Sequence, residues 1–289
     1  MSAGLFRGSL VGGWMGDPQE TWLVRAPGGR VAGWYQLELP DLENLDRAML
    51  GLIVDPDLRR QGFGHALLRH ALDRATGLGR SAVLGSAWRG SAGSAFARAA
   101  GAERGLVSFR SVIDLPVSIP VASTPAGYTL ESWSGPMPEK VLGDVAALYD
   151  TLADAPHRDG EAPARWDAAR VRDRLNGVVT RLGLRNYAIA ARHDASAELA
   201  ALTMVGLDPG EPIWGMQELT AVTRPHRGHQ LGLVVKVAML DLLGTEEPQL
   251  EHIVTSTAEA NHHMIAVNET LGYQAFGPPY EWWQIAGSW

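Results

Sequence analysis

The chain has 289 residues, 46% of them hydrophobic and 20% charged, which is enough for about two domains with packed cores. The net charge of −7 disfavours nucleic-acid binding, and the absence of cysteine excludes disulfides, cysteine-ligated zinc and a thiol nucleophile. No apolar run reaches about 18 residues and no long apolar signal segment opens the chain, so we expect a cytoplasmic protein that does not cross a membrane.

The most informative segment is an apolar strand, Met49 to Val54, followed by a cationic loop and then a helix. The loop contains Arg59-Arg60-Gln61-Gly62-Phe63-Gly64-His65, and the apolar helix continues from Ala66. Glycines allow the backbone to approach a diphosphate, and the first turn of a helix attracts anions. The loop lacks the third glycine of the Rossmann fingerprint and the Gly-Lys-Ser/Thr of a P-loop. We predict a diphosphate site; a strand–turn–helix with exposed arginines is the alternative.

The same arrangement recurs 168 residues later. Val222 corresponds to Val54, Arg227 to Arg59 and Gly232 to Gly64, with no gap. Matching strands (81–85 and 252–256) and helices (94–101 and 261–272) follow in both halves. This ordered repetition predicts two copies of one α/β unit.

The boundary between the copies is a segment with three prolines, residues 115–126, which suits an extended linker. We therefore expect an N-terminal domain over 1–117, a linker over 118–126 and a C-terminal domain over 127–289. The second copy is predicted to begin with a strand (128–132), two helices (139–153 and 166–179) and an antiparallel meander (187–191, 200–207 and 216–222). The first copy lacks the counterparts of that strand and most of those helices, because it is shorter or because its start was set too late.

The Arg-x-x-Gly-x-Gly pattern after a strand that ends in valine resembles the acetyl-CoA loop of the GNAT superfamily of N-acetyltransferases. With both halves considered, the chain is similar to tandem GNAT proteins with the two-domain architecture of mycothiol synthase and related actinobacterial enzymes. In the second half the marks are Thr220, Val222, His226 to His229, Leu231, Gly232, Lys236, Thr255 to Asn261, Met264, Val267 to Glu269 and Leu271 to Tyr273. The resemblance implies an α/β (α+β) fold of two GNAT domains, each a splayed mixed sheet flanked by helices, the first without its N-terminal strand and helices.

The resemblance also implies acetyl-CoA as the cofactor. Its pantetheine arm would pair with Ile53 and Val54 or with Ala221 and Val222. Its diphosphate would bind amides of Arg59, Arg60, Gln61, Gly62, Phe63, Gly64 and His65, or of Arg227, Gly228, His229, Gln230, Leu231, Gly232 and Leu233. Asn261 would reach the pantetheine or cap a helix. The first loop keeps both glycines and is favoured, because Gln230 stands where the family prefers glycine. His226 and His229 either contact phosphate or are solvated.

Acyl transfer to an amine requires a base, a donor for the oxyanion and a proton for the leaving thiolate. The family's acidic tyrosine is replaced by Ala97 and Asn268; Asn268 could still donate to sulfur, and Tyr273 is a fallback acid or a packed strand residue. Glu218 is the best candidate base, expected on the same side of its strand as Thr220 and Val222, or else a surface glutamate. Its counterpart, Leu50, cannot serve.

We expect Asp154 and His157 to bind the acceptor, although His157 also suits an exposed loop. The predicted function is acetyl-CoA-dependent N-acetylation of a primary amine, of a small molecule, by direct attack in a ternary complex. A non-catalytic acyl-CoA sensor or scaffold and a protein N-acetyltransferase are the alternatives. The first domain would bind CoA and either copy could be catalytic. We expect no nucleic acid, membrane or metal partner, and a monomer or homodimer.

Overall fold

The computed structural model describes residues 2–13, 16–118, 121–151 and 161–287. They form two compact units, each drawn from separate stretches of the chain. The N-terminal unit comprises the described residues of 9–107, 161–162 and 278–287. The C-terminal unit comprises those of 2–8, 108–151 and 163–277.

The N-terminal unit is a mixed sheet covered by helices. Its strands lie in the order β1-β2-β3-β4-β12. All neighbours are antiparallel except β3 and β4, which are parallel. The elements are β1 (Gln19–Arg25), β2 (Val31–Glu38), β3 (Arg47–Val54), the 3₁₀ turn η1 (Pro56–Leu58), α2 (Phe63–Gly77), β4 (Ala82–Trp88), α3 (Ala92–Ala99) and β12 (Tyr280–Ala286).

Helix α2 carries its apolar residues on one stripe, which explains its place against the sheet. Leu67, Ala71 and Ala75 recur every four residues and are buried. They pack with Tyr35 and Leu37 of β2 in one hydrophobic cluster. Burial of this stripe fixes where the N-terminus of α2 lies relative to β3.

The C-terminal unit has the larger sheet, in the order β5-β10-β9-β8-β7-β6, with β11 also paired to β5. Its elements are β5 (Glu103–Asp114, from Ser108 onward), β6 (Tyr128–Ser134), the 3₁₀ turn η2 (Glu139–Val141), α4 (Leu142–Asp150), α5 (Ala168–Arg170), the π-helical turn η4 (Val171–Asn176), α6 (Gly177–Leu182), β7 (Arg185–His193), β8 (Leu199–Leu207), β9 (Trp214–Val222), η5 (Arg224–His226), α7 (Leu231–Glu246), β10 (His252–Ala258), α8 (His262–Thr270) and β11 (Gln274–Ala275). The start of α1 (Ala3–Val11) packs here, with Leu5 against Val178 and Leu182 of α6.

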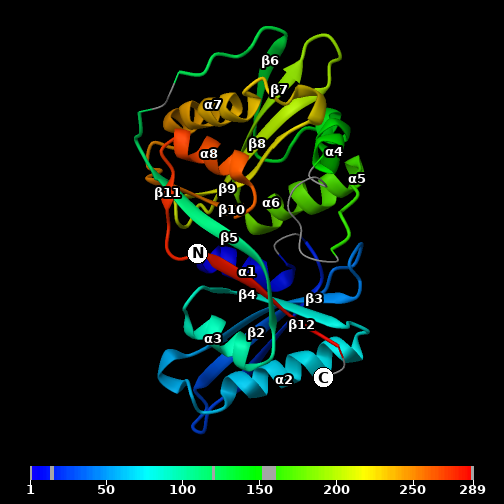
Figure 1. Cartoon of the computed structure of the whole chain (residues 1–289), viewed down its shortest axis with the longest axis vertical. Helices are drawn as coiled ribbons and strands as arrows, with labels where there is room; N and C mark the ends of the chain where they lie inside the picture. The colour runs from blue at the N-terminus through cyan, green and yellow to red at the C-terminus, as the bar shows by residue number, and fades with distance from the viewer. Residues whose placement is uncertain (1, 14–15, 119–120, 152–160, 288–289) are drawn as a thin grey trace. The chain divides into compact units, whose positions relative to one another are not determined.

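Helices cover both faces of this sheet (Figure 1). Tyr187 and Ile189 of β7 belong to the cluster of α7, whereas Ala188 and Ala190 belong to the cluster of α4. Because successive strand residues point to opposite faces, α7 and α4 lie on opposite sides. Every residue of β8 is buried, as expected for a strand covered twice.

The closing strands of the two copies are exchanged. In the repeat, β5 follows α3 just as β11 and β12 follow α8. Yet β5 pairs antiparallel with β10 of the second copy, and β12 pairs antiparallel with β4 of the first. The domain boundaries expected at 117 and 127 mark the ends of the sequence repeat, and as domain boundaries they remain a prediction. The compact units are divided differently, because each of them contains a closing strand from the other copy.

The repeat is otherwise in register. The turns η1 and η5 lie 168 residues apart, as do the first residues of α2 and α7. On the same count α1 corresponds to Val171–Val179 of the second copy. The described residues before β1 thus include a helix opposite η4 and α6, and none opposite β6 or α4.

Candidate active site

Each unit contains a splay between its two central parallel strands. Pairing of β3 with β4 stops at Met49 and Leu84, although β3 continues to Val54. Pairing of β9 with β10 stops at Met216 and Val254 in the same way. The predicted splayed sheets are thus present in both copies.

The two phosphate loops follow the same backbone path with different sequences. Arg60 and Gly62 have positive φ values of 64° and 89°. Their counterparts Gly228 and Gln230 have 87° and 57°. Glycine adopts positive φ without strain, and it occupies the second of these positions in the first loop (Gly62) and the first of them in the second loop (Gly228). Gln230 therefore stands immediately before α7 in the left-handed conformation, as Gly62 does immediately before α2.

Each loop is fastened by its first arginine. Nε of Arg59 donates to the carbonyl of Val54 at 3.3 Å, and Nε of Arg227 donates to that of Val222 at 3.2 Å. The first amide of α2 that bonds back to the loop is that of Ala66, to the carbonyl of Gly62. The preceding amides of the first turn are left to bind an anion. In α7 the amide of Leu233 already bonds back to the carbonyl of Gln230 at 3.0 Å, so the second loop leaves fewer amides for a diphosphate than the first.

The splay of the N-terminal unit encloses an apolar cavity of about 110 Å³. Its walls come from β3, α2, β4, α3 and β12: Leu50, Leu52, Leu68, Val83, Gly85, Ser86, Ala87, Gly93, Phe96, Ala97, Ala100, Ala102, Trp283 and Ile285. Among these side chains only those of Ser86 and Trp283 carry a polar atom. This space can hold an apolar or amide-containing chain but offers no acid or base.

The equivalent place in the C-terminal unit is polar. Lys236 corresponds to Leu68, is 2% exposed, and donates from Nζ to Oε1 of Gln217 at 3.2 Å. Its ammonium lies 4.7 Å from the ring centre of Tyr273, and burial lowers the pKa of Lys236 to about 7. Tyr273 is buried in the core, and desolvation raises the pKa of its hydroxyl.

A β-bulge in β9 re-aims Glu218. Met204 of β8 pairs with Leu219, but the next residue, Val205, pairs with Gln217, so Glu218 is extra. The corresponding pair β2–β3 is continuous, with Leu50 opposite Leu37. The expectation that Glu218 faces the same side as Val222 is therefore wrong, because a bulge breaks strand alternation.

The carboxylate of Glu218 lies over Gly206 on the α4 face. A Cβ placed on Gly206 would lie 2.6 Å from its Oε1, so any larger residue there would displace the carboxylate. Its charge also acts on buried Tyr149 of α4, whose pKa is raised first by burial and then by Glu218. Burial raises the pKa of Glu218 itself to about 7, although the side chain still reaches solvent. A wetted carboxylate surrounded by protein has the properties of a general base near neutral pH.

The other predicted residues have the following places. Asn261 caps α8, its Oδ1 accepting from the amide of Met264 at 3.2 Å. Asn268 is buried and donates from Nδ2 to Oγ1 of Thr257 at 3.3 Å. Asp154 and His157 lie outside the described residues.

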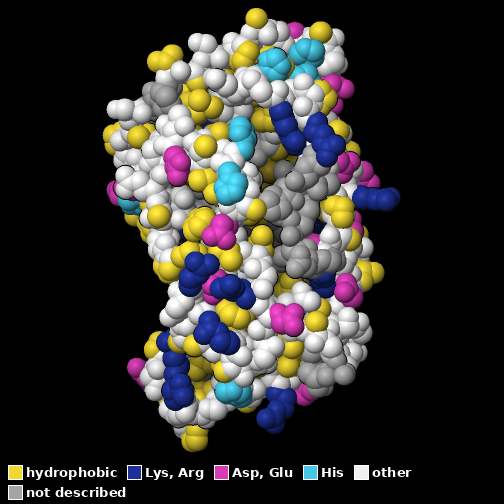
Figure 2. All heavy atoms as spheres, in the orientation of Figure 1, with side chains coloured by type: hydrophobic (Ala, Val, Ile, Leu, Met, Phe, Trp, Pro, Cys, Tyr) yellow, Lys and Arg dark blue, Asp and Glu magenta, His cyan; other side chains and the backbone are white. Residues whose placement is uncertain are grey.

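His193, His226 and His229 gather around Tyr128, at the start of β6 and the end of β7, and Figure 2 shows histidine side chains clustered on this part of the surface. His226 is buried, and its Nδ1 lies 2.8 Å from the hydroxyl of Tyr128, while burial lowers the pKa of its imidazole. His229 is exposed and its ring centre lies 5.7 Å from that of Tyr128. His226 thus anchors the start of the loop through its buried contact with Tyr128, whereas His229 is the histidine that a ligand could reach.

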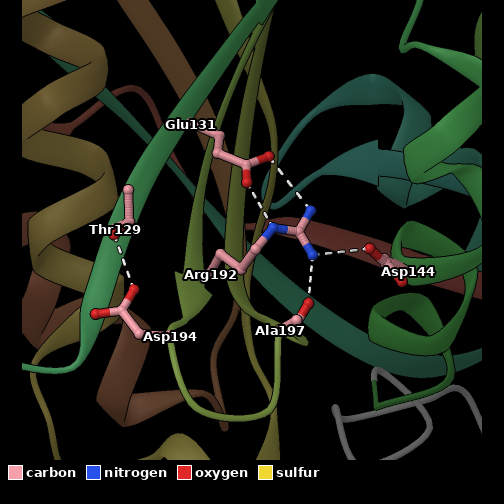
Figure 3. Close-up of polar contacts among 6 residues, drawn as sticks. All are labelled: Thr129, Glu131, Asp144, Arg192, Asp194 and Ala197. Carbon is pink, nitrogen blue, oxygen red and sulfur yellow. Dashed lines mark hydrogen bonds and ion pairs between the residues drawn. The ribbon is translucent and has the colours of Figure 1, made fainter.

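An ion-pair network that sequence reasoning missed holds α4 against the sheet (Figure 3). Arg192 of β7 binds both oxygens of Glu131 on β6 and, at 2.9 Å, Oδ2 of Asp144 on α4. It also donates to the carbonyl of Ala197. These contacts fix the helix that places Tyr149 near Glu218.

A family model described as the acetyltransferase (GNAT) family matches residues 7–88. A tandem GNAT protein from the clavulanic acid biosynthesis pathway, solved without acetyl-CoA, is 31% identical, with a TM-score of 0.85 over 100% of this chain and 89% of that one. The chain belongs to the GNAT family of acetyltransferases, in its tandem form.

More distant GNAT structures share the fold. One from Sphaerobacter thermophilus is 16% identical with a TM-score of 0.69, over 92% of this chain and 80% of that chain. One from Kribbella flavida is 15% identical with a TM-score of 0.57, over 100% and 97%. The family match and the 31% identical tandem GNAT protein make this chain an N-acetyltransferase. None of its described helices has the length and apolarity needed to cross a membrane.

Proposed function

We propose that the C-terminal unit transfers an acetyl group from acetyl-CoA to the primary amine of a small molecule, by direct attack in a ternary complex. The observation that carries this proposal is the bulge that turns Glu218 toward α4 at the splay. Bulges beside active sites commonly re-aim one side chain. The first copy has a regular register and Leu50 at the same place.

Acetyl-CoA fits this site by its anionic and extended parts. Arg227, Gly228, His229, Gln230, Leu231 and Gly232 would hold the diphosphate, and the free edges of Ala221 and Val222 in the splay would pair with the pantetheine arm. When bound, acetyl-CoA supplies the activated acyl group. The tandem GNAT protein that is 31% identical to the whole chain comes from the clavulanic acid biosynthesis pathway, and this supports a small-molecule acceptor.

The chain's own groups meet the three demands of the transfer. Glu218 takes a proton from the incoming amine. A backbone amide of β9 at the splay would donate to negative charge on the acyl oxygen. On the α7 face, the ammonium of Lys236 would supply a proton to the leaving thiolate and the amide of Asn268 a hydrogen bond, with the ring of Tyr273 packed against Lys236.

The N-terminal unit suits binding without transfer. Ile53, Val54, Arg59, Arg60, Gln61, Gly62, Phe63, Gly64 and His65 form a loop of the same geometry, beside an apolar cavity without a base. The second candidate function, an acyl-CoA sensor, is favoured for this copy alone.

The test is thiol release from acetyl-CoA with a panel of primary amines. We expect release with at least one small amine, and we expect Glu218→Gln to lower kcat about 10²–10⁴-fold, the usual contribution of a general base. Lys140→Met, on an exposed turn far along the chain from β9, is the control and should keep wild-type turnover. No release with any amine, together with tight CoA binding, would support the sensor for the whole chain.

A further inference from the structure

We infer that Glu218, Asn186 and Gly206 form a binding site for the primary ammonium group of the acceptor. This inference rests on the proposed function of the same unit, because it names the chemical group that the base receives. It adds two residues, Asn186 and Gly206, that sequence reasoning did not find. They lie on β7 and β8 and are direct partners in the sheet.

Two acceptor oxygens converge over Gly206. The Cβ position of this glycine lies 2.6 Å from Oε1 of Glu218 and 3.8 Å from Oδ1 of Asn186. Gly206 and Asn186 occupy paired positions, so their side-chain positions are on the same face of the sheet. The bulge brings Glu218 to that face from β9. Three adjacent strands therefore contribute to one small area.

The oxygen of Asn186 lacks a donor. The residue is 3% exposed, and its buried Oδ1 accepts no hydrogen bond from any residue that the structure describes. Its main-chain carbonyl, by contrast, accepts from the amide of Gly135 at 2.7 Å. A buried acceptor left unpaired is unfavourable, so a donor that reaches it gains affinity. Such a group needs a partner, which a ligand or an ordered water supplies.

A primary ammonium answers both oxygens. It carries three N–H donors and a positive charge, whereas a carboxylate and an amide oxygen can only accept. One N–H would donate to Oδ1 of Asn186 and another to Glu218. When Glu218 takes the latter proton, R–NH₃⁺ and the carboxylate become R–NH₂ and the carboxylic acid. The nitrogen lone pair is then free while Asn186 still holds the amine in place.

Gly206 makes this arrangement possible. Any side chain there would occupy the position of Oε1 and push the carboxylate away. A glycine inside a fully buried strand weakens the strand, so its presence requires a reason. The close approach of Glu218 supplies that reason.

The test measures binding of methylammonium by NMR, without acetyl-CoA, at pH 8 and constant ionic strength. The probe signal is the ¹³C-labelled carboxyl of Glu218, assigned from its loss in Glu218→Gln. We expect saturable shifts with methylammonium and none with tetramethylammonium, which has the same charge but no N–H. Equal shifts with both ions would overturn the site.

Three variants sharpen the test. Asn186→Leu should weaken methylammonium binding about fivefold or more, because one charged hydrogen bond is lost. Asn186→Asp keeps an acceptor oxygen and should bind methylammonium at least as tightly as the wild type does. This variant replaces Asn186→Leu in the test if the leucine variant fails to fold. Gly206→Ala should shift the carboxyl signal before any ligand is added, and Gly105→Ala, a strand glycine with open space around it, is its control. Unchanged binding in Asn186→Leu would contradict the inference.

The outcomes separate this inference from the proposed function. Methylammonium binding without thiol release from any amine would leave the site standing and refute catalysis. Thiol release with an acceptor KM unchanged by Asn186→Leu would uphold catalysis and refute the site. If Asn186→Leu raises the KM for the acceptor and leaves the pH profile of turnover unaltered, both the ammonium site and the proposed catalysis are supported.

Discussion

Glu218 and Leu50 hold the same position in the repeat, and their difference separates the two copies chemically. In the C-terminal unit burial raises the pKa of Glu218 to about 7, because the surrounding protein replaces water near the carboxylate. Leu50 instead lines an apolar cavity. One substitution and one bulge thus give the C-terminal unit an ionisable group at a position where the N-terminal unit has only an apolar side chain.

The raised pKa of Glu218 predicts a pH dependence of catalysis. A base acts when ionised, so kcat/KM should rise as pH increases through about 7 and then level off unless the acceptor amine titrates too. A pH series of thiol release measures this. In Glu218→Gln the step near pH 7 should vanish; a step that persists would assign it to another group.

Lys236 predicts a pH dependence of stability. Its pKa is about 7 in the folded chain and 10.5 in the unfolded one, so the unfolded state binds more protons between these values. The free energy of unfolding therefore decreases as the pH falls from about 10 toward 7, because protonation then favours the unfolded chain. Lys236→Met should raise the free energy of unfolding at pH 7 by roughly 2–5 kcal/mol.

Denaturant unfolding of wild type and Lys236→Met at pH 7 and pH 9.5 tests this prediction. The gain from the substitution should shrink at the higher pH, where the folded lysine is already neutral. Lys140→Met, at an exposed position, controls for loss of a charge. A gain that is equal at both pH values would show that Lys236 does not titrate in this range.

At the scale of elements, the strand–loop–helix units repeat more faithfully than their sequences. The positive φ positions coincide, although glycine occupies a different one in each loop. The first arginine of each loop makes the same bond to the carbonyl at the end of the preceding strand. The two loops therefore share one backbone conformation, and the copies differ in the strands beside them.

A matched pair of substitutions separates the loops. Gly64 and Gly232 lie at equivalent places in the first turns of α2 and α7, neither with positive φ. Glutamate there places negative charge against a diphosphate. Gly232→Glu should lower kcat/KM for acetyl-CoA by about 100-fold, equivalent to some 2.7 kcal/mol.

Gly64→Glu should leave turnover within about twofold and remove one equivalent of bound CoA. Steady-state kinetics and calorimetric stoichiometry together measure both effects. If Gly64→Glu abolished turnover and Gly232→Glu did not, the catalytic assignment would pass to the N-terminal unit.

At the scale of the whole molecule, the exchange of closing strands ties each unit to both halves of the chain. Strand β12 completes the sheet beside β4, although it comes from the end of the sequence. Its Glu281 is 2% exposed and pairs with Arg89 at 2.9 Å and with Arg104 at 3.3 Å. The N-terminal unit therefore depends on residues that lie far beyond the repeat boundary.

Removal of residues 278–289 tests this dependence. We expect β4 to lose its partner and its amides to exchange with deuterium much faster, because an unpaired edge opens readily. Hydrogen-exchange mass spectrometry measures this by segment. Glu281→Gln, which keeps β12 but removes the ion pairs, should have a smaller effect; unaltered protection of β4 in the truncated chain would contradict the exchange.

The sequence alone was sufficient for the repeat, the two strand–loop–helix units and the family, because these rest on local signals: glycine positions, a strand that ends in valine and an apolar helix. It also located Glu218 as the candidate base. It misjudged which way Glu218 points, since strand alternation fails at a bulge and no local signal marks the bulge. It missed Asn186 and Gly206, whose significance depends on three strands lying side by side.

What the sequence determined by itself is thus the kind of unit and its doubling, since backbone conformation in short segments follows from nearby residues. What only the tertiary structure decided is the exchange of β5 and β12, the polar filling around Lys236 and the two oxygens that meet over Gly206. Each of these depends on pairing between residues far apart in the chain, and such pairing is selected by the packing of the whole fold rather than by any local pattern.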